Sequence, residues 1–286
     1  MVIRQLYRLL FSFILGISVF SAAIAQDNNQ SPTATNTIVP NTTAPNTTAP
    51  NTIPTIHVGG YQFSPYVNLQ QDGRYTGLTL DIINALNQIQ QEVFFEFTVT
   101  SVEHRYKAYA LGRFDMMIFE NPAWGWQKIA DQFIPLHMID GEVFIALKAK
   151  AHNQNYFKNL TNKSVAFVKG YHYQFAHFET NADKLAKQFR PLFVSNNRAS
   201  IESILRERAD IAPVTHSYLQ YYLKVNPQDR HLLLISDKWD QEYDNGILLS
   251  LSSSLDAKKL SHWVQLLIDN GKLAELAAQY GIKSSQ

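Results

Sequence analysis

The sequence predicts an α/β fold for residues 56–282, built from two successive series of strands and helices. Short β-branched and aromatic segments, typical of strands, alternate there with segments whose apolar residues recur at helical spacing. Strands that alternate with helices form mainly parallel sheets flanked by those helices. The chain is 45% hydrophobic, which is enough to bury a large core.

The first series begins at residues 56–60, a short strand that ends in glycines. Asp72-Gly73 follows as a turn signal between extended segments. Residues 82–89 then carry apolar side chains at the i, i+3, i+4 and i+7 spacing of an amphipathic helix. The remaining elements of this series are a strand over 94–100, a helix over 105–111 that Gly112 ends, and a buried strand over 115–119.

The second series starts with a strand over 165–168, after which Gly170 opens a predicted helix that runs through Tyr173 and Phe178. Its later elements are an extended segment over 189–194, a helix over 201–205, a strand over 210–214, a helix over 219–223 and a strand over 246–251. Two helices close the chain, over 260–267 and 273–280, and each is followed by a glycine that ends it.

The N-terminal residues predict a cleaved signal peptide, residues 1–25. A basic start precedes an apolar run that is too short to span a bilayer, and Ala23-Ile24-Ala25 supplies the small-x-small cleavage pattern. Residues 26–55 consist largely of Asn, Thr, Pro and Ala, which bury too little to fold, so we expect a disordered linker. Because the chain has no cysteine, it cannot be a lipid-anchored lipoprotein.

Composition excludes several classes of site. Without cysteine there is no disulfide, thiol nucleophile or thiolate metal site, and the nine histidines lack metal-ligand spacing. We therefore expect neither a metal nor another cofactor. The net charge of +1 offers no basic patch for nucleic acid.

In order, five segments resemble the extracellular solute-binding proteins of family 3: IHVGGYQFSPYVNLQQDGRYTGLTLDIINAL, YALGRFDMMI, VAFVKGYHY, RADIAPVTHSYLQYYLKVNP and NGILLSLSSSLDAKKLSHWVQLLIDNGKLAELAAQYGI. The resemblance implies a type 2 periplasmic-binding-protein fold of two lobes joined by two crossing strands. By it, one lobe spans 56–147 and 245–286, and the other spans 148–244.

By the same resemblance, the protein captures a small ligand between the lobes and performs no chemistry on it. It would act in the periplasm as a monomer and pass the ligand to an inner-membrane ABC permease or a sensor. Two alternatives remain open: an interaction or regulatory module of the cell envelope, and a dehydratase-like enzyme on the same fold with Glu120 or His172 as acid or base.

Two departures from the family pattern bear on which ligand the protein can bind. Amino-acid binders carry a clamp arginine after the strand of the first lobe, but no arginine lies between Glu120 and Asp131. They also place an acid at the end of a strand of the second lobe, where this chain has Thr215 and His216. Because a lost charged hydrogen bond weakens binding by roughly 10–100-fold, we expect ordinary amino acids to bind weakly or not at all.

Candidate ligand contacts are residues that follow the predicted strands, where aromatic rings would wall a cleft and a few polar groups would orient the ligand. They are Tyr61, Phe63, Tyr66, Glu120, Asn121, Trp124, Trp126, Lys128, Tyr171, His172, Thr215, His216 and Tyr243. Because Trp124 and Trp126 alternate, one of the two is expected in the core. Arg105 is interpreted as a surface or inter-helix ion pair rather than a ligand clamp.

Overall fold

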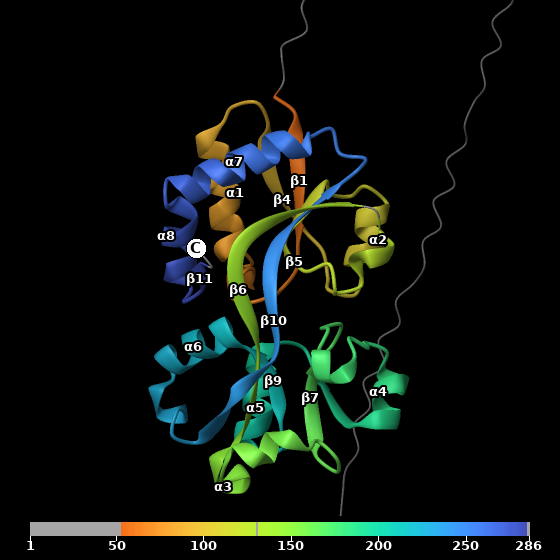
Figure 1. Ribbon diagram of the computed structural model, residues 1–286, viewed down its shortest axis with the longest axis vertical. Helices are drawn as coiled ribbons and strands as arrows, with labels where there is room; N and C mark the ends of the chain where they lie inside the picture. Colours follow the sequence, from red (N-terminus) through yellow and green to blue (C-terminus); the bar gives the residue numbers. More distant parts are fainter. Residues whose placement is uncertain (1–52, 130, 285–286) are drawn as a thin grey trace, which may run out of the picture. The chain divides into compact units, whose positions relative to one another are not determined.

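The computed structural model describes residues 53–129 and 131–284, which belong to one compact unit, Pro50–Gln286. The predicted signal peptide and nearly all of the predicted linker lie outside these ranges. No helix among the described residues has both the length and the hydropathy needed to cross a membrane. Two lobes make up this unit (Figure 1).

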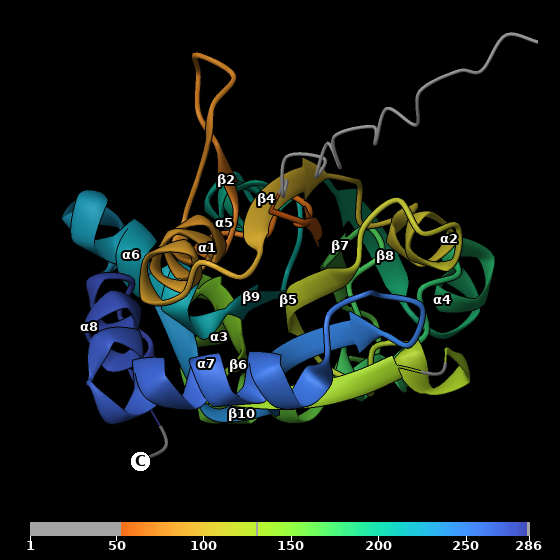
Figure 2. The ribbon, with the colours of Figure 1, turned by 90° about the horizontal axis from the view of Figure 1, so that it is seen from above.

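The first lobe is built on a parallel strand trio. β1 (Thr55–Gly60) lies between β4 (Phe94–Val99) and β5 (Met116–Glu120) and pairs in parallel with both. Helices α1 (Leu78–Ile89), α7 (Ala257–Asp269) and α8 (Lys272–Gln279) lie on one side, and α2 (Arg105–Ala110) lies on the other (Figure 2). The predicted helix over 82–89 is confirmed as part of α1, whose Ile82, Ala85 and Leu86 are buried.

Two long antiparallel strands run through both lobes (Figure 1). β6 (Asp131–Leu147) and β10 (Leu233–Ser250) are 17 and 18 residues long. β10 pairs with β5 in the first lobe, and β6 pairs with β9 (Ala212–Thr215) in the second. Register shifts in the β6–β10 ladder bend the pair between the lobes. These are the two crossover strands that the family resemblance implied.

The second lobe repeats the strand and helix alternation. β7 (Ser164–Val168) and β8 (Arg190–Val194) pair in parallel, and a bridge from Val165 to Ile211 joins β7 to the segment before β9. Its helices are α3 (Lys148–Ala151), α4 (Ala182–Gln188), α5 (Asn197–Leu205) and α6 (His216–Val225). The smaller strands are β2 (Asn68–Leu69), β3 (Tyr75–Thr76) and β11 (Lys283–Ser284). The predicted α/β class is confirmed in both lobes.

The predicted helix after Gly170 is wrong. Only a 3₁₀ turn forms there, η3 (Gln174–Ala176), and positive φ angles at His177 and Phe178 end it. The backbone N–H groups of Gln174 and Phe175 donate to the Asp240 carboxylate at 2.9 Å each. A side chain of β10 therefore caps this segment.

Candidate functional site

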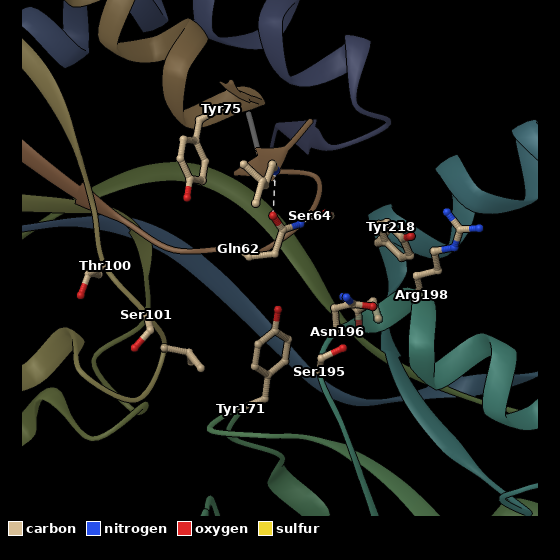
Figure 3. A pocket seen from close by; sticks show the side chains of 13 residues that line it. Gln62, Ser64, Tyr75, Thr100, Ser101, Tyr171, Ser195, Asn196, Arg198 and Tyr218 are labelled. Carbon is tan, nitrogen blue, oxygen red and sulfur yellow. Dashed lines mark hydrogen bonds between the residues drawn. The ribbon is translucent and has the colours of Figure 1, made fainter. Parts of the chain in front are cut away.

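Loops from the two lobes surround a cavity of about 520 Å³, which we call the tyrosine cavity (Figure 3). Its lining residues from the first lobe are Gln62, Ser64, Leu69, Tyr75, Thr100, Ser101 and Val102. Its lining residues from the second lobe are Tyr171, Ser195, Asn196, Asn197, Arg198 and Tyr218. A cavity of this size can hold a small organic molecule.

Topology explains why these residues meet. Thr100 directly follows β4, and Ser195 directly follows β8, both of which belong to parallel pairs. The carboxyl ends of parallel strands point to one edge of their sheet, where side chains from successive loops converge. Figure 3 shows the hydroxyls of Tyr75 and Tyr171 entering the space from opposite lobes.

Beside the tyrosine cavity, aromatic side chains fill part of the space between the lobes. Phe63 of the first lobe meets Tyr171 of the second edge-on at 5.3 Å and Trp124 at 6.0 Å. Trp124 in turn meets Tyr243 of β10 at 4.9 Å. The gap left among these rings holds only about 10 Å³, roughly one water. We call this cluster the aromatic partition.

A buried ion pair lies under the partition. Arg105 is 2% exposed and Glu120 is fully buried, with Nε and Oε1 3.5 Å apart. Arg105 also donates to the hydroxyl of Tyr106 at 2.6 Å, and Trp126 donates its indole N–H to Glu120 Oε2 at 2.7 Å. Burial raises the pKa of Glu120, and Arg105 opposes that rise. Both charges are thus held by partners inside the first lobe.

A second buried carboxylate ties the lobes together. Asp140 of β6 accepts from the Tyr66 hydroxyl at 2.7 Å, and it also accepts from the backbone N–H (3.1 Å) and the hydroxyl of Ser217 in α6. Asn245 of β10 donates to the Tyr66 hydroxyl at 3.1 Å. Burial raises the pKa of Asp140, and the hydrogen bonds from Ser217 and Tyr66 oppose that rise. Tyr66 therefore anchors the crossing strands.

Glu142 is the carboxyl group that faces the aromatic partition. It lies opposite Thr215 in the β6–β9 ladder, and its Oε1 accepts from the Thr215 hydroxyl at 3.1 Å. Its buried Oε2 has no hydrogen-bond partner among the described residues. Burial, and then the nearby Asp140, raise its pKa well above the usual value, which favours the neutral form.

His172 links the lobes on the other side of the partition. Its Nε2 lies 3.1 Å from the Tyr106 hydroxyl, and its carbonyl accepts from the Gln241 side chain at 3.1 Å. Burial, and then the charge of Arg105, lower the pKa of His172 to about 3. The imidazole is therefore neutral at physiological pH.

Solved structures share this arrangement of lobes and strands, although scans against sequence models of protein families and against curated proteins give no match. One is a histidine kinase sensor domain with similarity to periplasmic binding proteins, at 18% identity and a TM-score of 0.62, covering 80% of this chain and 97% of that one. A substrate-binding protein of an amino acid ABC transporter matches at 18% identity and a TM-score of 0.60, covering 79% of this chain and 99% of that one. The fold is that of the type 2 periplasmic binding proteins.

A third structure with the periplasmic-binding-protein fold is an ancestral amino acid-binding protein, described as a precursor of cyclohexadienyl dehydratase. It matches at 19% identity and a TM-score of 0.61, covering 79% of this chain and 94% of that one. At such identities the likeness extends to the fold alone.

The periplasmic-binding-protein fold brings many of the predicted contacts together, but in different settings. Members of the partition or its edge are Tyr61, Phe63, Trp124, Tyr171, His172 and Tyr243. Of these, Tyr171 alone also lines the tyrosine cavity. Of the two tryptophans, Trp126 is the more deeply buried, at 1% exposure. Arg105 forms an ion pair as predicted, but the pair is buried rather than on the surface.

The other predicted contacts serve local roles. Asn121 accepts from the backbone N–H of Ala123 at 2.9 Å, and Thr215 is buried between Asn197 and Glu142. The His216 ring lies 4.8 Å from that of Trp239. The side chain of Lys128 lies outside the described part of the structure.

Most residues of the tyrosine cavity were not among the predicted contacts. Ser101, Ser195 and Asn196 obey the rule used for the others, because each follows a predicted strand, whereas Thr100 was predicted as the last residue of a strand that ends at Val99. Their small polar side chains gave no further signal. Glu142 was missed because it lies inside a strand, where nothing in the sequence marks it as facing the other lobe.

Proposed function

We propose that this protein is a solute receptor that captures a small polar molecule in the tyrosine cavity and passes it to an uptake permease or a sensor. The observation that carries the proposal is the cavity itself, since both lobes supply its walls. A ligand held there contacts both lobes at once and stabilises their closed arrangement.

Capture without chemistry is supported by the state of the groups that could act as acid or base. Glu120 is held by Arg105 and Trp126 inside the first lobe. His172 is a weak base because its pKa is lowered to about 3. Neither side chain lines the tyrosine cavity. A general acid or base must reach the proton that it transfers, so this geometry favours a receptor over an enzyme.

The proposal also places the mature protein in the periplasm, after cleavage of residues 1–25, as a monomer without a lipid anchor. It assigns 56–147 and 245–286 to one lobe and 148–244 to the other. A ligand-loaded closed form would be what an inner-membrane permease or sensor recognises.

Purification from the native host, followed by native mass spectrometry and thermal shift with extracted metabolites, tests the proposal. A ligand at 100 times its dissociation constant adds about 2.7 kcal/mol of stability. Thr100→Trp should fill the cavity and abolish that gain while leaving the unliganded melting temperature nearly unchanged. Val99→Trp, one residue earlier on an exposed strand face, is the matched control and should keep the gain.

Persistence of the full gain in Thr100→Trp would place the ligand elsewhere. If no extracted metabolite binds the parent protein at all, the receptor proposal fails, and an interaction module on this fold is the better account.

A further inference from the structure

The tyrosine cavity has one charged lining residue among those described, and its charge is paired with a neighbouring carboxylate. Among its lining residues in the described part of the chain, none is Asp or Glu, and Arg198 is the one that is charged at neutral pH. The Arg198 side chain is 71% exposed, and its Nε donates to Glu202 at 2.9 Å. In Figure 3 it lies beyond Tyr218, away from Thr100 and Ser101. A cationic ligand would find no counter-charge, and an anionic ligand would compete with Glu202.

Neutral hydrogen-bonding groups are abundant in the same space. Tyr75, Thr100, Tyr171, Ser195 and Tyr218 line the cavity, and their hydroxyls make no side-chain hydrogen bond within the described residues. A hydroxyl can donate and accept, so this array matches a ligand that also does both. The tyrosine rings add flat apolar surface beside these polar groups.

The buried charged groups near the tyrosine cavity are held by partners within the protein. Arg105 and Glu120 hold each other, and Tyr66 and Ser217 hold Asp140. Glu142 faces the aromatic partition and is not among the lining residues of the tyrosine cavity. Recognition in this cavity therefore depends on neutral donors and acceptors.

We propose that the ligand is an uncharged, hydroxyl-rich molecule of the size of a monosaccharide or cyclic polyol. This inference rests on the proposed function and names the ligand class of the same cavity. Hydroxyl groups of the ligand pair with the free hydroxyls, and the C–H faces of its ring pack against tyrosine rings.

Titration calorimetry with sugars that share one ring and differ in charge tests the class. The probes are neutral D-glucose and N-acetyl-D-glucosamine, cationic D-glucosamine and anionic D-glucuronate, with D-galactose, D-ribose and myo-inositol as further neutral probes. We expect at least one neutral probe to bind with a Kd below about 1 mM, and its charged counterpart to bind at least tenfold more weakly.

Variants locate the contacts. Tyr171→Phe keeps the ring that meets Phe63 and removes the hydroxyl, so it should weaken binding of the neutral probe about tenfold. Arg198→Gln should change the same affinity less than threefold. Gln62→Glu places a carboxylate in the wall and should shift preference toward D-glucosamine.

The possible failures are distinguishable. Tighter binding of D-glucuronate or D-glucosamine than of every neutral probe overturns the ligand class and leaves the receptor function intact. The same holds if every neutral probe fails while a charged metabolite from the host extract binds and loses its affinity in Thr100→Trp. Absence of any bound metabolite overturns both proposals.

Discussion

At the residue scale, Arg105 and Glu120 are two buried charged side chains that pair with each other. An arginine in this lobe would hold a ligand carboxylate if its guanidinium were free. Here it lies 4.3 Å from the Tyr106 ring centre, 5.1 Å from that of Tyr61 and 3.5 Å from Glu120. Removing one member of a buried pair leaves the other charge uncompensated. Breaking the pair should therefore destabilise the first lobe, and within it the guanidinium is engaged by Glu120 and the two tyrosine rings.

His172 makes a testable contribution to the pH dependence of folding. Its pKa falls from about 6.5 in the unfolded chain to about 3 in the folded protein. A depressed pKa adds stability that is fully present above pH 6.5 and is lost as the pH falls toward 3. Urea unfolding of the parent and His172→Asn should give free energies of unfolding whose difference shrinks by about 1.4 kcal/mol per pH unit between pH 6 and 4.

Burial raises the pKa of Asp240 to about 6, so this carboxyl group titrates in the same range, and the difference between the two proteins, rather than either curve, isolates the imidazole. Parallel curves would mean that His172 is protonated as easily in the folded protein as in the unfolded chain. Histidine ring shifts followed by NMR give an independent measurement of the same pKa.

At the scale of elements, the sequence predicted the helices and strands whose own residues carry a helical or strand pattern. The helical spacing of residues 82–89 appears as α1, whose apolar positions form one buried face, and the aromatic strand over 94–100 appears as β4, in which Phe95 is buried. β6 carries Pro135, His137 and the Asp140-Gly141-Glu142 run, which break any strand pattern. Its strand character comes from pairing with β10, some 100 residues away, which no local window contains.

The structure of the segment after Gly170 also depends on a residue that is distant in the sequence, and this dependence can be tested. Its turn depends on Asp240, whose carboxylate accepts from Gln174 and Phe175. Asp240→Ala should speed hydrogen exchange at these two amides and lower the free energy of unfolding by about 1–3 kcal/mol, because two backbone donors, of which the Phe175 N–H is partly buried, lose their charged acceptor. Asn181→Ala removes the nearby cap of α4, which accepts from Lys184, and should leave the two amides unchanged. Equal exchange in Asp240→Ala and the parent would contradict the capping role.

At the scale of the whole described unit, the candidate site depends on contacts between lobes that no single segment specifies. Tyr171 and Phe178 of the second lobe pack against the core of the first. Topology brings residues near strand ends to the space between the lobes, and of the predicted ligand contacts Tyr171 lines the tyrosine cavity. The distance between the lobes decides which of these residues fill the aromatic partition and which line the tyrosine cavity. No single segment of the sequence determines that distance.

The contact between Phe63 and Tyr171 should help to set the balance between closed and open lobes. An aromatic pair contributes about 0.5–1.5 kcal/mol beyond its buried area, so Phe63→Leu should reduce the closed population relative to the open one by about 2–13-fold. Phe63 does not line the tyrosine cavity, so we expect any loss of ligand affinity to come through that population. Small-angle scattering should show a larger radius of gyration without ligand and recovery at saturating ligand.

Phe157→Leu is the control, because Phe157 stacks on Phe144 at 6.2 Å in a core cluster that contains neither Phe63 nor Tyr171. It should change neither the radius of gyration nor the affinity. A radius in Phe63→Leu equal to that of the parent, with weaker binding, would instead mean that Phe63 shapes the ligand site directly. If both quantities stay at the parent values, the lobes are held together by the hydrogen bonds of Asp140, and the aromatic partition only fills space.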